Sequence, residues 1–442
     1  MTKRWRELDA AGALKVVMWL FVLACLTAAA AAPDRRQMLP GLWNIYTTPA
    51  QLTKDYFVVG GVSAAFFNAF IMALLCAVLY LLPCAVVNGT SYLAFTLTVG
   101  FSFWGIHLLN ALPCMLGTVL YCAVKREAVG KHVNFMIFAT GLAPLVSDLF
   151  FRYPALQLHG LTAGSAAAGV AVGLFIGFLM PAGCSFSPGV HKGFSLYSAA
   201  LPMGMAAIFL RALLYVVLGG QLPPIEALLG ESRPAVFYGF YGALFAVFLL
   251  LGLWKNGWSF RGYGKLLKSS GHKTDLSAEF GPALALMNIG IYGLFIMLYY
   301  TVVGGSLNGV TFGLVLCMGC CAVAGSHPGN VWPIMVGYAL AATLGRLLYV
   351  GEGVPLTLNA QTILVGLCYA NGLSPVSGRY GWPLGILAGV LHFILVTCVP
   401  AMHGGFLLYN GGFTACLLCM FLLPVLERFC RTKEERLAVK QK

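Results

Sequence analysis

Hydrophobic residues in this chain gather in long runs, and Gly, Pro, Asn and charged residues separate one run from the next. A run of about 20 apolar residues is long enough to cross a bilayer as a helix. We expect about 14 such segments, at residues 13–32, 57–83, 90–108, 111–124, 133–151, 160–184, 193–219, 236–254, 281–303, 309–325, 330–350, 357–374, 381–401 and 405–427. The pattern predicts an all-α integral membrane protein.

Three of these segments leave alternatives open. The first run ends in alanines before Pro33, which is also typical of a signal peptide with a small-residue cleavage site. A long basic stretch precedes this run, so we favour an uncleaved first helix. Segments 111–124 and 133–151 are short or interrupted, and the number of crossings changes if one of them is re-entrant.

The composition restricts the class of protein further. Of the 442 residues, 60% are hydrophobic and 9% are charged, and the mean hydropathy is +0.85. So few charges cannot cover the surface of a soluble globule of this size. A soluble enzyme, a disordered regulator and a coiled coil are therefore excluded.

The net charge of +13, from 27 Lys and Arg against 14 Asp and Glu, is carried by loops and tails. The basic residues of the N-terminal stretch, one central loop and the C-terminal tail are Lys3, Arg4, Arg6, Lys15, Lys255, Arg261, Lys265, Lys268, Lys273, Arg428, Arg431, Lys433, Arg436, Lys440 and Lys442. Such clusters fit the positive-inside rule better than a nucleic-acid groove. We expect a multi-pass protein of the cell inner (plasma) membrane with both termini cytoplasmic.

The second half of the chain repeats the first with gaps. A shift of 220 residues places Gly61, Asn68, Asn88, Gly89, Gly105, His107, Asn110, Pro113, Met115 and Gly117 on Gly281, Asn288, Asn308, Gly309, Gly325, His327, Asn330, Pro333, Met335 and Gly337. Shifts of 231 and 212 continue the match to Gly372–Pro375 and to His403–Tyr409. An odd number of crossings separates the halves, which predicts two repeats of inverted topology.

The repeat sets the expected division of the chain. A first membrane helix and an external loop occupy residues 1–56, and repeat 1 follows at 57–219. A linker helix and a basic cytoplasmic loop fill 220–280, repeat 2 spans 281–430, and 431–442 form a basic cytoplasmic tail.

Both repeats contain a helix break at the same place, GLAP at Gly141 to Pro144 and GLSP at Gly372 to Pro375. Within a bilayer, a broken helix is tolerated only where its freed backbone groups face protein or a water-filled cavity. A pair of corresponding breaks is a sequence indication of a transporter site, so we predict that these four residues bind substrate. Close helix packing or a simple kink is the alternative.

A second pair of motifs follows a histidine in each half. We expect Gly193 and Gly405 to open helices whose amide hydrogens cradle an anionic or dipolar solute. Side chains that can add hydrogen bonds to the solute are Tyr197, Ser198, Tyr409 and Asn410. The alternative for Tyr197 is a place in the interfacial aromatic belt.

A third pair combines His107 with Asn110 and His327 with Asn330, each followed by Pro. The repeated spacing suggests a gate or a proton relay, although a packing role is the more common one for a membrane histidine.

Charged residues within the apolar segments are few. Asp148 and Arg152 are four residues apart, so we expect them to neutralise each other. Arg211 and Arg346 could attract an anion or extend toward a membrane face.

Taken together, the doubled Asn-Gly, Gly-x-His-x-x-Asn-x-x-Pro, GLAP or GLSP, and His-x-Gly-Phe-x-Leu-Tyr motifs resemble a bacterial membrane-protein family known only as a domain of unknown function. The resemblance covers about residues 50–430 and implies a duplicated helical membrane fold without a defined activity. It also implies Asn after the Tyr in both copies, and this chain departs from that pattern at Ser198.

We expect a transporter or channel for a small polar or anionic solute, with its site at the interface of the two repeats. The alternative is an intramembrane enzyme that acts on a lipid-linked substrate with a histidine base, and a third option is a structural protein without a polar cavity. We expect no cofactor, no metal and no nucleic-acid partner. The expected partners are the bilayer and the solute, and the sequence leaves a homo-oligomer open.

Overall fold

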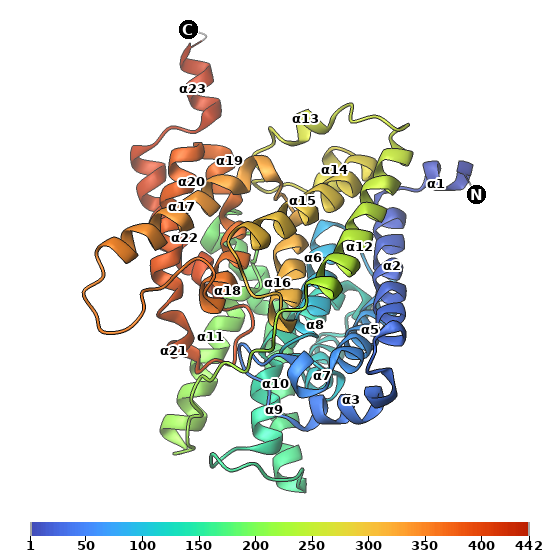
Figure 1. The fold of residues 1–442 in the computed structure, drawn as a ribbon, viewed down its shortest axis with the longest axis vertical. Helices are drawn as coiled ribbons and strands as arrows, with labels where there is room; N and C mark the ends of the chain where they lie inside the picture. The colour runs from blue at the N-terminus through green and yellow to red at the C-terminus, as the bar shows by residue number, and fades with distance from the viewer. Residues whose placement is uncertain (1, 441–442) are drawn as a thin grey trace.

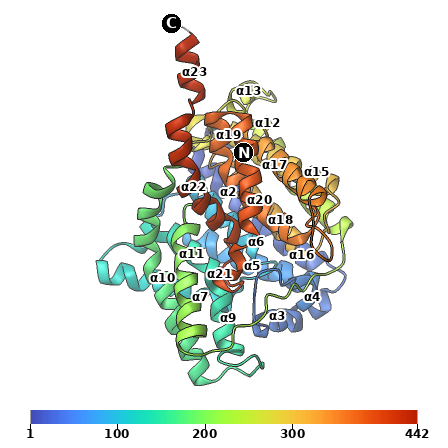
Figure 2. The ribbon, with the colours of Figure 1, turned by 90° about the vertical axis from the view of Figure 1, so that its left-hand side faces the viewer.

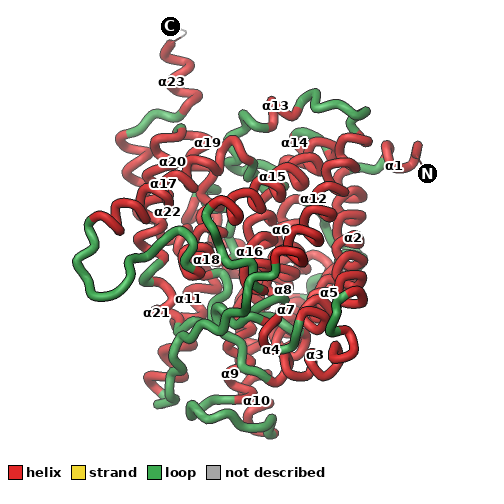
Figure 3. The backbone as a smooth tube through the Cα atoms, viewed as in Figure 1, coloured by secondary structure: helices red, strands yellow, loops and turns green. Residues whose placement is uncertain are grey.

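The computed structural model describes residues 2–440, and this range consists of helices, short helical turns and loops without a β-strand (Figures 1 and 3). The expected all-α fold is confirmed. Met1, Gln441 and Lys442, which end the predicted first and last regions, lie outside the described residues.

Residues 2–217 form eleven α-helices and four other helical turns. Their bounds are α1 (Thr2–Glu7), α2 (Ala10–Ala31), η1 (Arg35–Gln37), α3 (Met38–Thr47), α4 (Tyr56–Val59), α5 (Val62–Leu79), α6 (Gly89–Phe101), α7 (Leu108–Lys125), η2 (Val129–His132), α8 (Val133–Ala139), η3 (Thr140–Leu142), α9 (Ala143–Phe151), α10 (Ala163–His191), α11 (Ala200–Arg211) and the π-helical η4 (Ala212–Val217).

The second half follows the same order. Its elements are α12 (Pro234–Lys255), α13 (Tyr263–Leu266), α14 (Leu276–Glu279), α15 (Pro282–Val302), α16 (Gly309–Gly319), η5 (Cys320–Ala322), α17 (Pro328–Leu347), α18 (Gln361–Ala370), η6 (Asn371–Leu373), α19 (Ser374–Tyr380), α20 (Trp382–Val396), α21 (Val399–His403), α22 (Asn410–Phe429) and α23 (Lys433–Lys440). Both predicted breaks are present, because η3 and η6 interrupt their helices with a turn of tighter geometry.

Within residues 2–440, nine helical stretches are long and apolar enough to cross a membrane. Two shorter apolar helices, at Gly309–Ala322 and Trp382–Val396, coincide with other predicted segments. Length and composition therefore indicate a helical membrane protein. The larger number of about 14 crossings stays a prediction.

The two halves are inverted, as the helices that precede α5 and α15 demonstrate. Trp254, near the end of α12, stacks on Trp5, just before α2, with ring centroids 6.2 Å apart. At the other end of the pair, Ala32 after α2 and Ala235 at the start of α12 line one groove. Helix α2 packs on α5 and helix α12 packs on α15, so the two hold corresponding places, and they run antiparallel. Both chain ends lie at one end of the molecule in Figure 1, and Figure 2 separates α10 and α11 from α15 and α17.

The equivalent helices α6 and α16 cross at the centre, where glycines bring the backbones into contact. A Cβ atom added to Gly100 would lie 2.7 Å from the carbonyl oxygen of Gly313. The reverse addition at Gly313 would lie 2.3 Å from the oxygen of Gly100. Neither position can hold a larger residue without moving the other helix.

Each half fills the helix break of the other half with a tyrosine. The Tyr409 ring packs on Gly141, and the amide of Leu408 donates to the Gly141 carbonyl oxygen at 3.0 Å. In the mirror arrangement, Tyr197 packs on Gly372, and the amide of Leu196 donates to its carbonyl oxygen at 3.0 Å. The two cores are therefore interlocked, and the breaks are covered by protein rather than by lipid.

This exchange also corrects the predicted helix starts. We expected helices to open at Gly193 and Gly405, but α11 begins at Ala200 and α22 at Asn410. In each preceding loop one amide, that of Leu196 or of Leu408, bonds to the helix break of the opposite half, and the loop does not form a helix there. Gly193 and Gly405 have φ values of +87° and +78°, which favour glycine and start the loops rather than helices.

The expected neutralisation of Asp148 is confirmed. Arg152 forms a salt bridge with it, and the Tyr215 hydroxyl donates a hydrogen bond to its second oxygen. Arg211 is partly buried near the end of α11, and Arg346 is exposed near the end of α17.

Gly141→Ala tests the interlocked tyrosines. The new Cβ atom would lie 1.8 Å from Cε2 of Tyr409, so we expect overpacking to cost about 1–3 kcal/mol and to lower the melting temperature in detergent. Gly239→Ala in α12 is the matched control, because nothing lies within 4 Å of its added Cβ atom. Equal melting temperatures for the two variants would contradict the packing described here.

Candidate functional site

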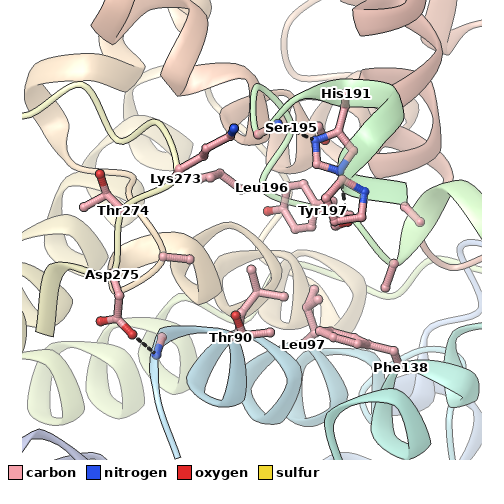
Figure 4. A pocket seen from close by; sticks show the side chains of 18 of the residues that line it. Thr90, Leu97, Phe138, His191, Ser195, Leu196, Tyr197, Lys273, Thr274 and Asp275 are labelled. Carbon is pink, nitrogen blue, oxygen red and sulfur yellow. Dashed lines mark hydrogen bonds between the residues drawn. The ribbon is translucent and has the colours of Figure 1, made fainter. Parts of the chain in front are cut away.

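A cavity of about 370 Å³ lies between the two halves. From the second half, its lining includes Lys273, Thr274, Asp275, Ala324 and Tyr409. The first half contributes the start of α6, Phe138 of α8 and the loop from Gly193 to Ala199. Figure 4 shows Lys273, Thr274 and Asp275 along one wall, opposite His191, Ser195 and Tyr197.

The cavity runs from an exposed mouth to a buried deep end. At the mouth, Thr90 and Lys273 are exposed. The mouth faces the end of the molecule that carries both termini, since α13 and α14 flank the lining loop there (Figure 1). At the deep end, Leu97, Phe138 and Tyr409 are buried. The cavity thus reaches the region where the halves interlock.

The start of α6 forms one wall and is capped from both halves. Asn88 is the N-cap residue and accepts a hydrogen bond from the Ser91 amide at 3.1 Å. Asp275 of the second half accepts from the Gly89 amide at 2.7 Å and from the Ser277 amide at 2.9 Å. These amide donors hold the Asp275 carboxylate at the start of α6, where it also lines the cavity.

Asp55 occupies the equivalent place in the first half. It accepts from the amides of Gly309 at 3.0 Å, Phe57 at 2.7 Å and Gly230 at 2.9 Å. Burial raises the pKa of Asp55, while these hydrogen bonds and the charge of Arg233 oppose the rise. The start of each central helix is therefore held by a carboxylate of the other half.

His191, at the end of α10, makes hydrogen bonds to both ends of the loop that follows this helix. The Gly193 amide donates to Nδ1 of His191 at 3.2 Å, so Nε2 carries the proton and donates to Oγ of Ser198 at 2.9 Å. In the second half, His403 makes the same bond to Oδ1 of Asn410 at 2.9 Å. A hydroxyl or an amide oxygen serves as acceptor equally well, so Ser198 and Asn410 accept the equivalent hydrogen bond in the two halves.

The two interlocked tyrosines differ in how their hydroxyls are satisfied. Oη of Tyr197 lies 2.7 Å from Oδ1 of Asn371 and 2.7 Å from the carbonyl oxygen of Cys317. Oη of Tyr409 is buried and has no hydrogen-bond partner among the described residues. The equivalent of Asn371 in the first half is Thr140, whose hydroxyl donates to its own helix at Ile137.

Two side chains of opposite charge, Lys273 and Asp275, line the cavity near its mouth. Lys273 makes no ion pair within residues 2–440, whereas neighbouring Lys192 is paired with Glu427 at 2.6 Å. Nδ1 of His272 accepts from Arg379 at 2.8 Å, which requires a neutral ring. Burial, together with the charges of Arg379 and Lys273, lowers the pKa of His272. Among the described residues, Lys273 thus lines the entrance without an ion-pair partner, two residues from the Asp275 carboxylate.

The predicted substrate residues divide into two groups. The cavity brings together Gly193, Tyr197, Ser198 and Tyr409. The other predicted residues do not line this cavity. Gly141 and Gly372 contact the tyrosine rings, and Pro144 and Pro375 lie in the first turns of α9 and α19. Gly405 packs near Ile225, and Asn410 lines a separate cavity of about 230 Å³.

The predicted gate or relay residues cap helices outside this cavity. His107 is the N-cap of α7, and its amide donates to Oδ1 of Asn110 at 3.0 Å. His327 and Asn330 repeat this box at the start of α17, also at 3.0 Å. The spacing that suggested a relay is accounted for by helix capping.

Several residues that line the cavity or cap the central helices were not predicted from the sequence. Asp55 and Asp275 were detectable, because they are 220 residues apart and share the shift of the other repeated residues. Leu97 and Phe138 carried no signal, since apolar residues are ordinary in membrane helices.

Comparison with known proteins gives one family. A family model described as "Protein of unknown function (DUF1576)" matches residues 34–216 and 255–428, one stretch in each half. No curated protein and no solved structure matches the chain. The expected resemblance to a duplicated family of unknown function is confirmed.

Hydrogen–deuterium exchange tests whether each central helix is capped by a carboxylate of the other half. We expect Asp275→Ala to speed amide exchange in the first turn of α6, and Asp55→Ala to speed it in the first turn of α16. A lost cap costs about 1 kcal/mol, which corresponds to roughly five-fold faster exchange. Each variant is the control for the other, and a response confined to the mutated residue's own half would refute the described contacts.

Proposed function

Because this chain belongs to the family described as "Protein of unknown function (DUF1576)", which names no activity, we propose its function from the site: it is a membrane transporter. It moves a small polar or anionic solute through a site at the interface of the two inverted repeats. We place it in the cell inner (plasma) membrane with both termini cytoplasmic, since the basic loop and tail lie with the termini at one end.

The observation that carries this proposal is the cavity itself. A helical membrane protein with a purely structural role has no need of a polar-lined space between its halves. This space is lined by Ser195, Ser198, Thr90 and Lys273, and it ends at Tyr409 of the opposite half. Secondary transporters of inverted-repeat design bind their solutes at such a junction.

The cavity opens at one end only, which supports alternating access over a passive pore. Thr90 is exposed at its mouth, whereas the equivalent Val310 in the second half is fully buried. Leu196 is partly exposed, and the equivalent Leu408 is fully buried. A pore would expose both members of each pair at once, and alternating access exposes one member at a time.

The segment between the halves covers the closed end. Ile225 lies over Gly405, and Leu222 lies over Gly404. The amide of Leu228 donates to the carbonyl oxygen of Thr53 at 3.1 Å, which fastens this segment to the first half. Movement of this cover away from Gly405 is the step that opens the opposite side.

Flux measurements in proteoliposomes test the proposal. We expect saturable uptake of at least one solute from a panel of small neutral and anionic metabolites. Leu196→Trp narrows the mouth and should lower this uptake about ten-fold or more, because pocket volume limits entry. Leu298→Trp, at an exposed position of α15, is the matched control and should keep wild-type uptake. Absence of uptake for every solute would overturn the transport function.

Cysteine labelling tests the one-sided opening. We expect Thr90→Cys to react with a membrane-impermeant maleimide roughly ten-fold or more faster than Val310→Cys, because reactivity follows exposure. The exposed native thiols Cys84 and Cys398 are replaced by Ser in both proteins. Equal rates at the two positions would exclude the asymmetric state.

A further inference from the structure

This inference rests on the proposed transport function and specifies its route and its solute. We call the cavity of about 370 Å³ between the halves the inner cavity and the cavity of about 230 Å³ at Asn410 the outer cavity. We infer that the outer cavity is the second half of the route, and that the solute is a small neutral molecule with a hydrogen-bond acceptor. The repeat, one free donor in each cavity and the charges of the two linings support this inference.

The two cavities are built from equivalent residues. Three pairs related by the shifts of 212 or 220 residues, with one member in each cavity, are Pro188 and Pro400, Ser198 and Asn410, and Lys273 and Thr53. Thr53 and Lys273 share a left-handed backbone, with φ values of +68° and +54°. The outer cavity is therefore the repeat-related copy of the inner one.

The two cavities lie at opposite ends of the pair of central helices. Asn88 and Thr90, at the start of α6, line the inner cavity. Thr53, which lines the outer cavity, is two residues before Asp55, whose carboxylate holds the start of α16. Because the halves are inverted, these two helix starts face opposite sides of the membrane. In Figures 1 and 2, α21, which contributes Pro400 to the outer cavity, accordingly lies far from α13.

The outer cavity is smaller and partly covered. Thr362 and Thr397 are exposed at its rim, whereas Val365 and Asn410 are buried in it. Ile225, which belongs to the segment that covers the closed end, also lines it. Movement of this cover, which opens the opposite side in the proposed cycle, widens the outer cavity.

Each cavity contains a side chain whose acceptor atom is bound by a histidine. In the inner cavity, Oγ of Ser198 accepts from Nε2 of His191 at 2.9 Å, so the Ser198 proton stays available. In the outer cavity, the Leu407 amide donates to Nδ1 of His403 at 3.3 Å. Nε2 of His403 therefore carries the proton and donates to Oδ1 of Asn410 at 2.9 Å, which fixes the orientation of the Asn410 amide group.

The donors that remain free are accessible from the cavities. Ser198 is half-buried and lines the inner cavity. Nδ2 of Asn410 donates to no residue within the range 2–440, and it is not enclosed by protein, so it keeps surface in the outer cavity. A solute that supplies an acceptor oxygen can thus bind the equivalent donor on each side.

Neither lining carries an unbalanced charge. In the inner cavity, Lys273 and Asp275 provide one charge of each sign. None of the described residues that line the outer cavity is charged, and its polar ones are Thr53, Thr362, Thr397 and Asn410. Burial of an ion without a counter-charge costs far more than burial of a neutral polar group that is hydrogen-bonded. A neutral solute therefore suits both cavities.

The outer rim and the cavity volumes restrict the solute further. The Thr397 hydroxyl donates to the carbonyl oxygen of Ile394 at 2.7 Å, so its oxygen can still accept a hydrogen bond from a solute. Volumes of about 230 and 370 Å³ are near or below the lower end for ligand sites. We therefore expect a small amide or polyol.

Thiol labelling in oriented membrane vesicles tests the outer cavity without requiring transport. Val365→Cys places a thiol in this cavity, and Leu364→Cys, its buried neighbour outside the lining, is the matched control. The exposed thiols Cys84 and Cys398 are replaced by Ser. We expect Val365→Cys to react with an impermeant methanethiosulfonate roughly ten-fold or more faster than Leu364→Cys, and from the face opposite to that for Thr90→Cys. Equal rates, or reaction of Val365→Cys and Thr90→Cys from the same face, would overturn the assigned route.

Protection of the Val365→Cys thiol then tests the class of solute. The probes, at equal concentration, are neutral lactamide, its anionic analogue lactate and the cation of 1-amino-2-propanol. We expect lactamide to slow labelling about two-fold or more, because a solute that occupies half of the cavities excludes the reagent from them. Stronger protection by either ion, or none by lactamide, would overturn the assigned class.

Asn410→Ala tests the donor. It removes the amide nitrogen and should lower the lactamide affinity, obtained from the concentration dependence of protection, about five- to ten-fold, the effect of one neutral hydrogen bond. Asn410→Ser supplies a hydroxyl, as Ser198 does in the inner cavity, and should restore most of the affinity. Asn359→Ala, at an exposed position outside the cavity lining, is the matched control. Unchanged affinity in Asn410→Ala would overturn the role of the donor.

The outcomes separate this inference from the proposed function. The measurements on Val365→Cys keep Asn410 intact, so they decide the route and the class of solute even if Asn410→Ala does not fold. Labelling and protection without uptake of any solute by proteoliposomes would leave both cavities standing and overturn the transport function. Uptake without reaction of Val365→Cys would leave transport standing and overturn the outer route.

Discussion

The whole arrangement depends on one constraint: the backbone groups freed at a helix break inside a membrane need hydrogen-bond partners, and here other parts of the protein provide them. Backbone groups released at the breaks near Gly141 and Gly372 have no water to bond with if they face lipid. Each half solves this by extending a loop into the other, so that Leu408 and Leu196 donate to the two glycine carbonyls. The same exchange brings both tyrosines to the junction and makes the two halves inseparable.

The exchange extends to the central helices, and it explains why a cavity forms where it does. The starts of α6 and α16 are each held by a carboxylate from the opposite half, Asp275 and Asp55. These contacts fix the loops that border the cavity. The contacts that both halves share hold the loops around the cavity in place. The halves differ at sites such as Thr140 and Asn371, and this difference makes the junction asymmetric and leaves the Tyr409 hydroxyl without a partner among the described residues.

Much of the fold could be predicted from the sequence, because a membrane helix needs about 20 mostly apolar residues and each such run can be recognised by itself. The breaks at Gly141 and Gly372 were predictable for the same reason, since Gly and Pro act locally. Of the predicted substrate residues, four share the cavity with residues the sequence did not single out. The predicted helix starts at Gly193 and Gly405 were wrong, because one amide of each following loop, that of Leu196 or of Leu408, bonds to a distant partner that local pattern does not reveal.

The sequence by itself determined a duplicated, all-helical membrane chain with broken helices at equivalent places. Hydrophobic length, glycine and proline positions and the repeat are properties of neighbouring residues or of residue order, so they can be read along the chain. Only the tertiary structure decided which half fills which break, which end of the junction is open, and which tyrosine keeps a free hydroxyl. Those outcomes depend on contacts such as Tyr197 with Asn371, residues 174 apart in the sequence, and on the space left where an equivalent contact is missing.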